Sequence, residues 1–359
     1  MTPLWINLAL VFVFSFFARY AAIPSFSNKS NFTSVYIKPN KILVLGALLS
    51  LVLISGLRTN IGDTYFYAHI YEQFDFTWDY VLSQKDIGFG IFQMILKHYS
   101  DDPQIMIFTT ALITNVLIVT ILYNYSRIFE ISMYVYITGG LFLVSMNGIR
   151  QVLAAAIAFT GIKFLMEGNW KRYFLIILLA SIFHQSALIL IPLYFMVRFK
   201  AWSKITIALV LLSIVIVIGY SQFSSLLFSA IQETQYGGYQ NFNEGGASSI
   251  RVVVSAVPLC IAYIGRDNMR EIFPKSDIVV NMTLLGFIFM VIATQNWIFA
   301  RFSIYFSLYQ LILISWIIKL FKEKDRKLIY YGILVFYFIY YYYESVISLN
   351  IIYQSNYLK

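Results

Sequence analysis

The chain has 359 residues, of which 60% are hydrophobic and only 12% charged, and its formal net charge is +9. Its apolar residues form blocks long enough to cross a bilayer, separated by short polar gaps, which excludes a water-soluble globular domain. A spanning backbone must satisfy its own hydrogen bonds, and the blocks lack the alternating pattern of barrel strands. We therefore predict an all-α fold, a polytopic bundle of transmembrane helices that forms a single integral membrane domain over residues 1–359.

Ten full-length spans are predicted along the chain. The first apolar run has no basic residue before it and Arg19 after it, so we expect an uncleaved span with its N-terminus outside. The predicted spans cover residues 3–18, 42–57, 103–123, 128–146, 150–166, 204–220, 251–265, 278–294, 298–318 and 328–348. This arrangement also leaves the C-terminus outside.

Two longer polar stretches lie on the outer face in this topology. Residues 58–102 hold seven carboxylates: Asp63, Glu72, Asp75, Asp79, Asp86, Asp101 and Asp102. Within this loop, Ile87, Ile91, Ile95 and Tyr99 recur every four residues, which predicts an amphipathic helix over 86–99 lying on the membrane. Residues 221–249 are rich in Gly, Asn and Tyr, and we expect a flexible loop there that covers a substrate or simply connects two spans.

The segment 173–197 is long enough for one span but carries Phe-His-Gln-Ser at its middle, at residues 183–186. If it crosses once, the basic clusters that follow it fall outside, against the positive-inside rule. If it enters and returns as two half-length helices, those clusters all fall in the cytoplasm. We therefore predict a helical hairpin, giving twelve helical elements, with His184 within the membrane's thickness beside a cavity, because broken helices need protein or water around them.

Four arginines depart from the charge distribution of this topology. It places 19 of the 26 Lys and Arg residues on the cytoplasmic side, so the net charge reflects orientation and not nucleic-acid binding. Arg58, Arg150, Arg251 and Arg301 instead lie at the outer ends of spans. One arginine there would simply snorkel or pair with a carboxylate. Four of them beside a membrane-depth histidine favour a site for an anion such as a diphosphate, which guanidinium groups bind bidentately.

Three motifs resemble those of a known family. They are GLRTNIGDTYFY at residues 56–67, NGIRQ at 147–151 and ASIFHQSA at 180–187. Together they resemble the EpsG family, which comprises the Wzy-like polymerases of bacterial extracellular polysaccharide and O-antigen synthesis. The resemblance covers most of the chain, and Arg301 near Tyr305 fits its later part.

The resemblance implies a GT-C-like glycosyltransferase of the bacterial cytoplasmic (inner) membrane, with its active site facing the periplasm or the cell exterior. Such a polymerase transfers a glycan from undecaprenyl-diphosphate to the terminal sugar of another lipid-linked repeat unit, in exopolysaccharide, capsule or O-antigen synthesis. The expected partners are that undecaprenyl-diphosphate-linked oligosaccharide, the lipid bilayer, and a chain-length regulator and flippase of the same pathway. No nucleic acid partner and no cofactor are expected.

Roles for individual residues follow from this chemistry. His184 is expected to be the general base toward the acceptor hydroxyl, although it could instead cap backbone groups at the hairpin break. Asp63 is expected to orient Arg58 or His184, or to be the base itself. The diphosphate would be bound by Arg58, Arg150, Arg251 and Arg301. Contacts to glycan or lipid are expected from Tyr65, Tyr67, Tyr71 and Tyr305.

No metal site is predicted. The three histidines are scattered without ligand spacing, and the single cysteine, Cys260, lies in an apolar block, which also excludes a disulfide framework. Two other functions stay open. A lipid-linked oligosaccharide flippase or transporter could also use interior arginines, although the sequence lacks the internal repeat typical of transporters. A membrane acyltransferase could use His184 as its base, but it would not require four outer-face arginines.

Overall fold

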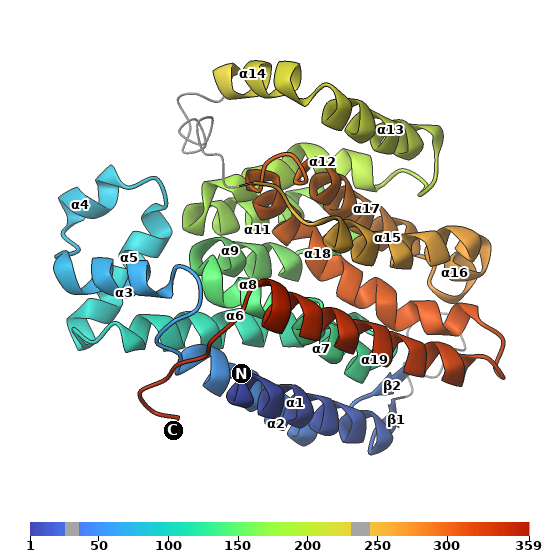
Figure 1. Cartoon of the computed structure of the whole chain (residues 1–359), viewed down its shortest axis with the longest axis horizontal. Coiled ribbons are helices and arrows are strands. Elements are labelled where there is room, and N and C mark those ends of the chain that lie inside the picture. Colours follow the sequence, from blue (N-terminus) through green and yellow to red (C-terminus); the bar gives the residue numbers. More distant parts are fainter. Residues whose placement is uncertain (26–35, 231–244, 359) are drawn as a thin grey trace.

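The fold is almost entirely helical. The computed structural model describes residues 1–25, 36–230 and 245–358 (Figure 1). One small departure from the predicted all-α fold is an antiparallel pair of three-residue strands, β1 (Ile23–Ser25) and β2 (Tyr36–Lys38), which follows the first helix. All other regular elements in the described ranges are helices.

The helices of the first half follow the predicted spans closely. They are α1 (Thr2–Tyr20), α2 (Lys41–Gly56), α6 (Gln104–Tyr125), α7 (Phe129–Thr138), α8 (Leu141–Asn147), α9 (Ile149–Thr160) and α10 (Ile162–Glu167). The predicted span 128–146 is bent by 54° between α7 and α8. Gly140 makes this bend, because its φ of 87° is a backbone conformation that only glycine adopts without strain.

The second half contains more short elements. They are α11 (Trp170–Phe183), the 3₁₀ helix η1 (Gln185–Ile189), α12 (Leu190–Val197), α13 (Lys204–Ile218), α14 (Tyr220–Ala230), α15 (Ser249–Ile264), α16 (Arg266–Ile272), α17 (Ser276–Ile292), α18 (Ile298–Ile317), η3 (Ile318–Leu320), α19 (Arg326–Tyr342) and the π-helical turn η4 (Tyr343–Ser348). Helix α18 is buried along nearly its whole length and forms much of the core with α7, α9 and α17.

The number of membrane crossings stays a prediction. Among the described residues, three helices are long and apolar enough to span a bilayer by themselves, and six spans result if each bent pair counts as one. A helix lies at the position of each of the ten predicted spans, but several of these helices are shorter than a full span. A 16-residue helix such as α2 is about 24 Å long, which is less than the roughly 30 Å hydrocarbon core.

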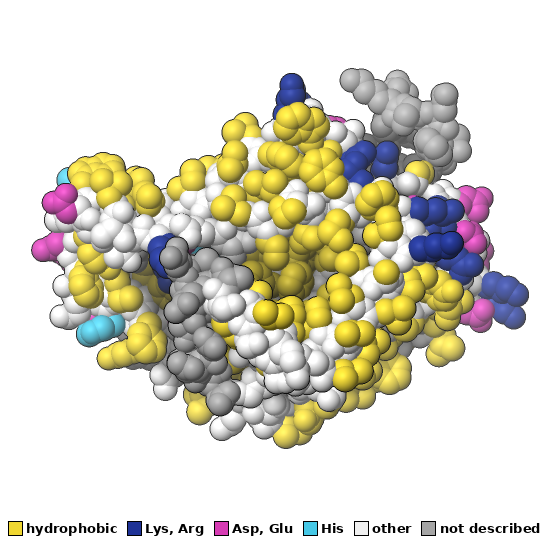
Figure 2. Space-filling model, turned by 90° about the horizontal axis from the view of Figure 1, so that it is seen from above, with side chains coloured by type: hydrophobic (Ala, Val, Ile, Leu, Met, Phe, Trp, Pro, Cys, Tyr) yellow, Lys and Arg dark blue, Asp and Glu magenta, His cyan; other side chains and the backbone are white. Residues whose placement is uncertain are grey.

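The molecule has two chemically different ends. In Figure 1 the long helices run side by side, with α3 to α5 at the left end and α16 and the strands at the right. Figure 2 shows Lys and Arg side chains gathered mainly at the right end and a largely hydrophobic surface in between. At this basic end Arg19, Arg127 and Lys319 line one pocket, and Arg270 donates to the carbonyl of Ala201. Basic residues from segments that were predicted to share one side of the membrane, such as Arg127, Arg270 and Lys319, therefore lie at the same end of the molecule (Figure 1).

The segment 173–197 folds as an out-and-back hairpin. Helix α11 ends at Phe183, and η1 and α12 carry the chain back. At its base, the Arg198 guanidinium Nη1 donates to the carbonyl oxygen of Leu165, at 2.8 Å, so the chain leaves the hairpin beside where it entered. The break predicted at His184 is thus present, and the residue lies at the hairpin's tip.

Residues 58–102, the predicted outer loop, fold into three helices, α3 (Thr64–Gln73), α4 (Trp78–Ser83) and α5 (Ile87–Tyr99). Helix α5 covers the segment predicted as an amphipathic helix. Its Gly88 and Phe89 are buried against the protein, whereas Ile95 and Tyr99 are 51% and 76% exposed. The C-terminal part of the predicted apolar stripe therefore faces away from the protein, whereas Ile91 packs against a buried cluster, and contact with a membrane remains a prediction.

The expected loop 221–249 is partly helical. Residues 221–230 belong to α14, because Tyr220, Phe223 and Leu227 recur at helical spacing and pack against the core. Residues 231–244 lie outside the described residues. After them, the backbone N–H of Ala247 donates to the carbonyl of Ala293 at 2.7 Å, so the end of this segment is held against the residues that follow α17.

Candidate functional site

His184 occupies the break between α11 and η1. Its backbone is extended (φ −159°, ψ 115°), and its N–H closes the last turn of α11 by donating to the carbonyl of Ala180. The residue is only 8% exposed. A polar imidazole at a buried helix break needs a hydrogen-bonding partner, and this partner comes from the outer loop.

Asp86 is that partner. Its Oδ2 lies 2.9 Å from Nδ1 of His184, and its Oδ1 accepts the backbone N–H of Gln185 at 3.2 Å. Asp86 is 4% exposed. An ionised carboxylate can only accept hydrogen bonds, so this contact favours the tautomer in which Nδ1 carries the proton and Nε2 carries the lone pair. An imidazole held in this way is suited to accept a proton at Nε2.

The start of α5 must approach the end of α11 closely for this contact to form. Gly88, two residues after Asp86, allows the approach: a Cβ built there would lie 2.4 Å from Cγ2 of Ile182 and 3.0 Å from its carbonyl oxygen. Any larger residue would push the two helices apart. Glycine at this position therefore brings Asp86 within reach of His184.

Arg150, at the start of α9, completes the His184 cluster, by which we mean Tyr67, Asp86, Arg150 and His184. Its Nη1 lies 3.2 Å from Oδ2 of Asp86, and its Nε donates to the Tyr67 hydroxyl at 3.3 Å. The guanidinium also stacks over the Tyr67 ring, at 5.5 Å from the ring centre. The Arg150 side chain is 41% exposed, so one positive charge of the cluster is open to solvent.

A second group of polar contacts joins α9, η1 and α18 beside this cluster. Gln151, which follows Arg150, donates to the carbonyl of Arg301 at 2.9 Å and lies 3.4 Å from the Ser186 hydroxyl. That hydroxyl lies 2.7 Å from the hydroxyl of Tyr305. These bonds fix the first turn of α18, and with it Arg301, relative to the hairpin.

Asp63 pairs with Arg301. Its Oδ2 lies 3.8 Å from Arg301 Nη2, and the guanidinium lies 4.6 Å from the ring centre of Trp297. Both side chains of the pair are partly exposed, at 41% for Asp63 and 33% for Arg301. The preceding turn has two residues with positive φ, Ile61 at 82° and Gly62 at 55°, and Ile61 is strained there because it has a side chain. A β-branched residue in the left-handed region costs about 1–3 kcal/mol and is often found beside functional groups.

Arg58 is buried, with an exposed fraction of 1%. Its Nη2 donates to the carbonyl of Met146 at 2.8 Å, its Nε to the hydroxyl of Thr64 at 3.0 Å, and its Nη1 to the carbonyl of Ser55. Burial lowers the pKa of Arg58 to about 9, so the side chain stays charged at neutral pH. The structure gives Arg58 internal acceptors, and its binding of a diphosphate stays a prediction.

Arg251 also has an internal partner. Its Nε donates to Oε1 of Glu344 at 2.7 Å, which joins the first turn of α15 to the π-helical turn after α19. Glu344 is 5% exposed. Carboxylate pairing was the alternative to anion binding for each arginine, and it is present for Arg251 as it is for Arg150 and Arg301.

The four predicted tyrosine contacts divide into two groups. Tyr65 is 70% exposed and stacks parallel to His69, and Tyr67 belongs to the His184 cluster. Tyr71 is fully buried and donates to the carbonyl of Ser100, and Tyr305 is 1% exposed. Only Tyr65 and Tyr67 therefore lie where a ligand from outside could touch a ring.

Asp86 is the site residue for which sequence analysis gave no role. It appeared only as one of seven carboxylates in the outer loop. One sequence feature could have singled out Asp86: it directly precedes an amphipathic helix and is followed two residues later by a glycine. Among the described residues, no group of three His, Cys, Asp or Glu side chains is placed to hold a metal ion.

Comparison with known proteins identifies one family. The family model described as the EpsG family matches residues 41–357, which is nearly the whole chain. No curated protein and no solved structure matches. The matched range contains every residue of the His184 cluster and all four arginines discussed above.

Proposed function

Given that the chain belongs to the EpsG family and is a membrane protein of polysaccharide biosynthesis, we propose that it polymerises lipid-linked oligosaccharide repeat units. It would act as a GT-C-like glycosyltransferase on the outer face of the bacterial cytoplasmic membrane. The observation that supports this proposal best is the contact between Asp86 and His184, because it holds an imidazole ready to accept a proton. The contact lies at the end of the molecule away from the basic clusters.

The proposed reaction is a glycosyl transfer between two carrier-linked glycans. The terminal hydroxyl of one repeat unit attacks the anomeric carbon of the other glycan, and its proton passes to Nε2 of His184. The bond from that carbon to the undecaprenyl-diphosphate oxygen breaks, and the diphosphate leaves with the bonding electrons. Asp86 keeps the imidazole oriented and stabilises the imidazolium that forms.

Arg150 and Arg301 are the proposed ligands of the diphosphate. Both side chains are partly exposed, and Gln151 links the helices that carry them. Guanidinium groups bind phosphate oxygens bidentately and stay charged, so they can stabilise the charge that develops on the leaving group. In this proposal Asp63 orients Arg301, whereas Arg58 and Arg251 stabilise the helix ends around the site.

Deletion of the gene followed by analysis of the carrier-linked glycans tests the function. A polymerase defect leaves single repeat units on the carrier at the outer face of the membrane. Accumulation of the same units on the cytoplasmic side would identify a flippase instead. Polymer of full length that lacks only an acyl substituent would identify an acyltransferase.

Complementation with point variants tests the residues. His184→Ala should restore no polymer although the protein is inserted normally, and His98→Ala is the matched control, since His98 is an exposed histidine on α5. Full-length polymer from His184→Ala would remove His184 from the mechanism.

A further inference from the structure

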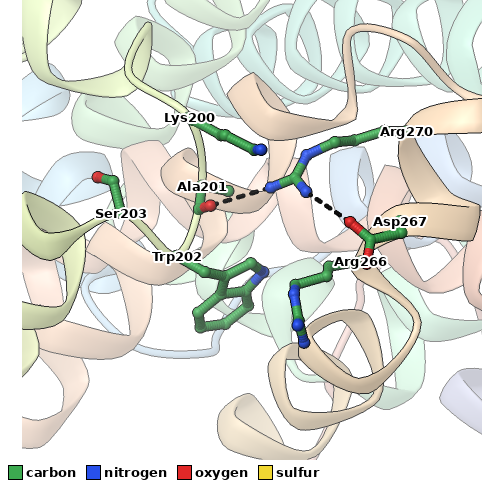
Figure 3. Close-up of a pocket in the computed structure, with 7 residues that line it drawn as sticks. All are labelled: Lys200, Ala201, Trp202, Ser203, Arg266, Asp267 and Arg270. Atoms are coloured by element: carbon green, nitrogen blue, oxygen red, sulfur yellow. Dashed lines mark hydrogen bonds and ion pairs between the residues drawn. The ribbon is translucent and has the colours of Figure 1, made fainter.

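A pocket of about 340 Å³ lies at the basic end of the molecule, away from the His184 cluster. It is formed between the segment that joins α12 to α13 and the short helix α16. The lining residues are Lys200, Ala201, Trp202, Ser203, Arg266, Asp267 and Arg270 (Figure 3). Neither the family relationship nor the proposed reaction assigns a role to this pocket.

Arg270 forms a fixed wall of the pocket. Its Nη2 donates to the carbonyl of Ala201 at 3.0 Å, its Nη1 to Asp267 at 3.1 Å, and its Nε to Asp277 at 3.0 Å. These three contacts tie α16 to the segment after α12 and to the first turn of α17. The guanidinium is therefore held in place before any ligand arrives, which lowers the entropic cost of binding.

Two further cations give the pocket an excess of positive charge. Lys200 extends toward Arg270, and the Arg266 side chain lies beside Trp202 (Figure 3). Within the described part of the chain, neither Lys200 nor Arg266 takes part in an ion pair, and Arg266 packs at 5.0 Å over the ring of Tyr263. The three cations are offset by two carboxylates, Asp267 and Asp277, which both pair with Arg270 and leave the charges of Lys200 and Arg266 without an ionic partner among the described residues. An anion is the ligand that such a pocket would attract.

The rim of the pocket is aromatic and apolar. Trp202 has a φ of 62°, a strained conformation for a residue with a side chain, and its ring packs edge-on against Tyr263 at 5.2 Å. Two residues that adjoin this group in sequence are also apolar and exposed: Phe199, which precedes Lys200, at 46%, and Ile264, which follows Tyr263, at 82%. A ligand with a charged head and an apolar tail would fit both surfaces.

We propose that this pocket binds an anionic phosphate group, which is carried by a phospholipid headgroup or is free phosphate. Lys200 and Arg266 contact the phosphate oxygens, and Arg270 supplies the fixed positive wall. The exposed apolar side chains at the rim lie where acyl chains would run. Basic pockets between membrane helices on the cytoplasmic side commonly recognise anionic lipid headgroups in this manner.

Native mass spectrometry of the full-length protein tests the proposal, with phosphatidylglycerol and phosphatidylcholine as lipid probes. The protein should retain phosphatidylglycerol in preference to phosphatidylcholine. The double variant Lys200→Ala/Arg266→Ala should bind phosphatidylglycerol about 25-fold more weakly, since each basic residue at a membrane surface contributes about fivefold in affinity. The control Lys322→Ala/Lys324→Ala removes two exposed lysines outside the pocket and should bind normally.

Calorimetric titration with inorganic phosphate distinguishes the two sources of the ligand. Binding of phosphatidylglycerol without binding of phosphate identifies a lipid headgroup, whereas saturable phosphate binding that the double variant loses identifies the free anion. The conservative variant Lys200→Arg/Arg266→Lys keeps both charges and should retain binding. The proposal would be overturned by two results together. These are equal binding of phosphatidylglycerol by the wild type, Lys200→Ala/Arg266→Ala and Lys322→Ala/Lys324→Ala, and no saturable binding of phosphate.

Discussion

Among the arginines at helix ends, the buried Arg58 differs from the partly exposed Arg150 in its partners. Arg58 reaches the carbonyls of Ser55 and Met146, which belong to the last turns of α2 and α8. Carbonyls at a helix C-terminus have no partner within the helix and carry partial negative charge, so they attract a cation. Arg150, by contrast, is 41% exposed and lies in the His184 cluster.

Alanine substitutions should distinguish these two roles. We expect Arg58→Ala to lower the free energy of unfolding by about 3 kcal/mol, because it removes a buried charged donor and leaves two helix ends without a partner. Arg150→Ala should lower stability by no more than about 1 kcal/mol, because Asp86 keeps its bonds to His184 and Gln185, while polymer synthesis is lost. Thermal unfolding of the purified proteins, together with an assay of polymer length, measures both. Equal stability of the two variants would contradict a structural role for Arg58.

The role of Asp86 can be tested by a substitution that keeps its shape. Asp86→Asn retains an acceptor for Gln185 but loses the charge that stabilises the imidazolium of His184. We expect the turnover number to fall by about 10²- to 10⁴-fold, with little change in KM for the carrier-linked substrate. Asp79→Asn, at an exposed position in the same loop, is the control. A change in KM alone would show that Asp86 affects binding and does not position the base.

At the scale of helices, the site depends on how closely α5 meets α11. We expect Gly88→Ala to displace Asp86 from His184, because the added methyl group would meet Ile182 at 2.4 Å. A shift of about 1 Å at a catalytic group can reduce the rate about 100-fold. The polymer assay measures this, and Gly332→Ala in α19 serves as the control, since a Cβ there would have no neighbour within 4 Å. Wild-type activity of Gly88→Ala would show that the close approach is dispensable.

The C-terminal segment illustrates a contact between elements that are distant in sequence. The Tyr353 hydroxyl donates to the carbonyl of Ile54 at 2.9 Å, and the backbone N–H of Thr59 donates to the carbonyl of Gln354 at 3.0 Å. The segment therefore covers the end of α2 and the turn that carries Arg58. These contacts help to explain why Arg58 is buried.

For the molecule as a whole, the hairpin of α11, η1 and α12 determines which polar contacts lie at the same end of the helix bundle. The contact of Arg198 with Leu165 lies at its base and the contact of His184 with Asp86 at its tip. This arrangement predicts that residues 198–204 and the outer loop 58–102 lie on opposite sides of the membrane. The sidedness follows from the positive-inside rule.

Cysteine labelling of intact cells tests this topology. In a Cys260→Ser background, a cysteine at position 83 in the outer loop should react with a membrane-impermeant maleimide. A cysteine at position 204 should react only after the membrane is permeabilised. Both positions are exposed, so a difference in labelling reports sidedness. Labelling of position 204 in intact cells would show that residues 173–197 cross the membrane as a single span.

Local sequence patterns were enough to predict the helical membrane architecture, the positions of the main helices and the break at His184. These features depend on local composition and spacing, which act within one or two helical turns. Three contacts could be seen only once the chain was folded. His184 meets Asp86, which is 98 residues away in sequence, Asp63 pairs with Arg301, and Arg58 turns inward. Such contacts depend on which helix ends meet when the bundle packs. A sequence pattern gives the type and spacing of residues, but it does not show which polar groups find one another once water is excluded.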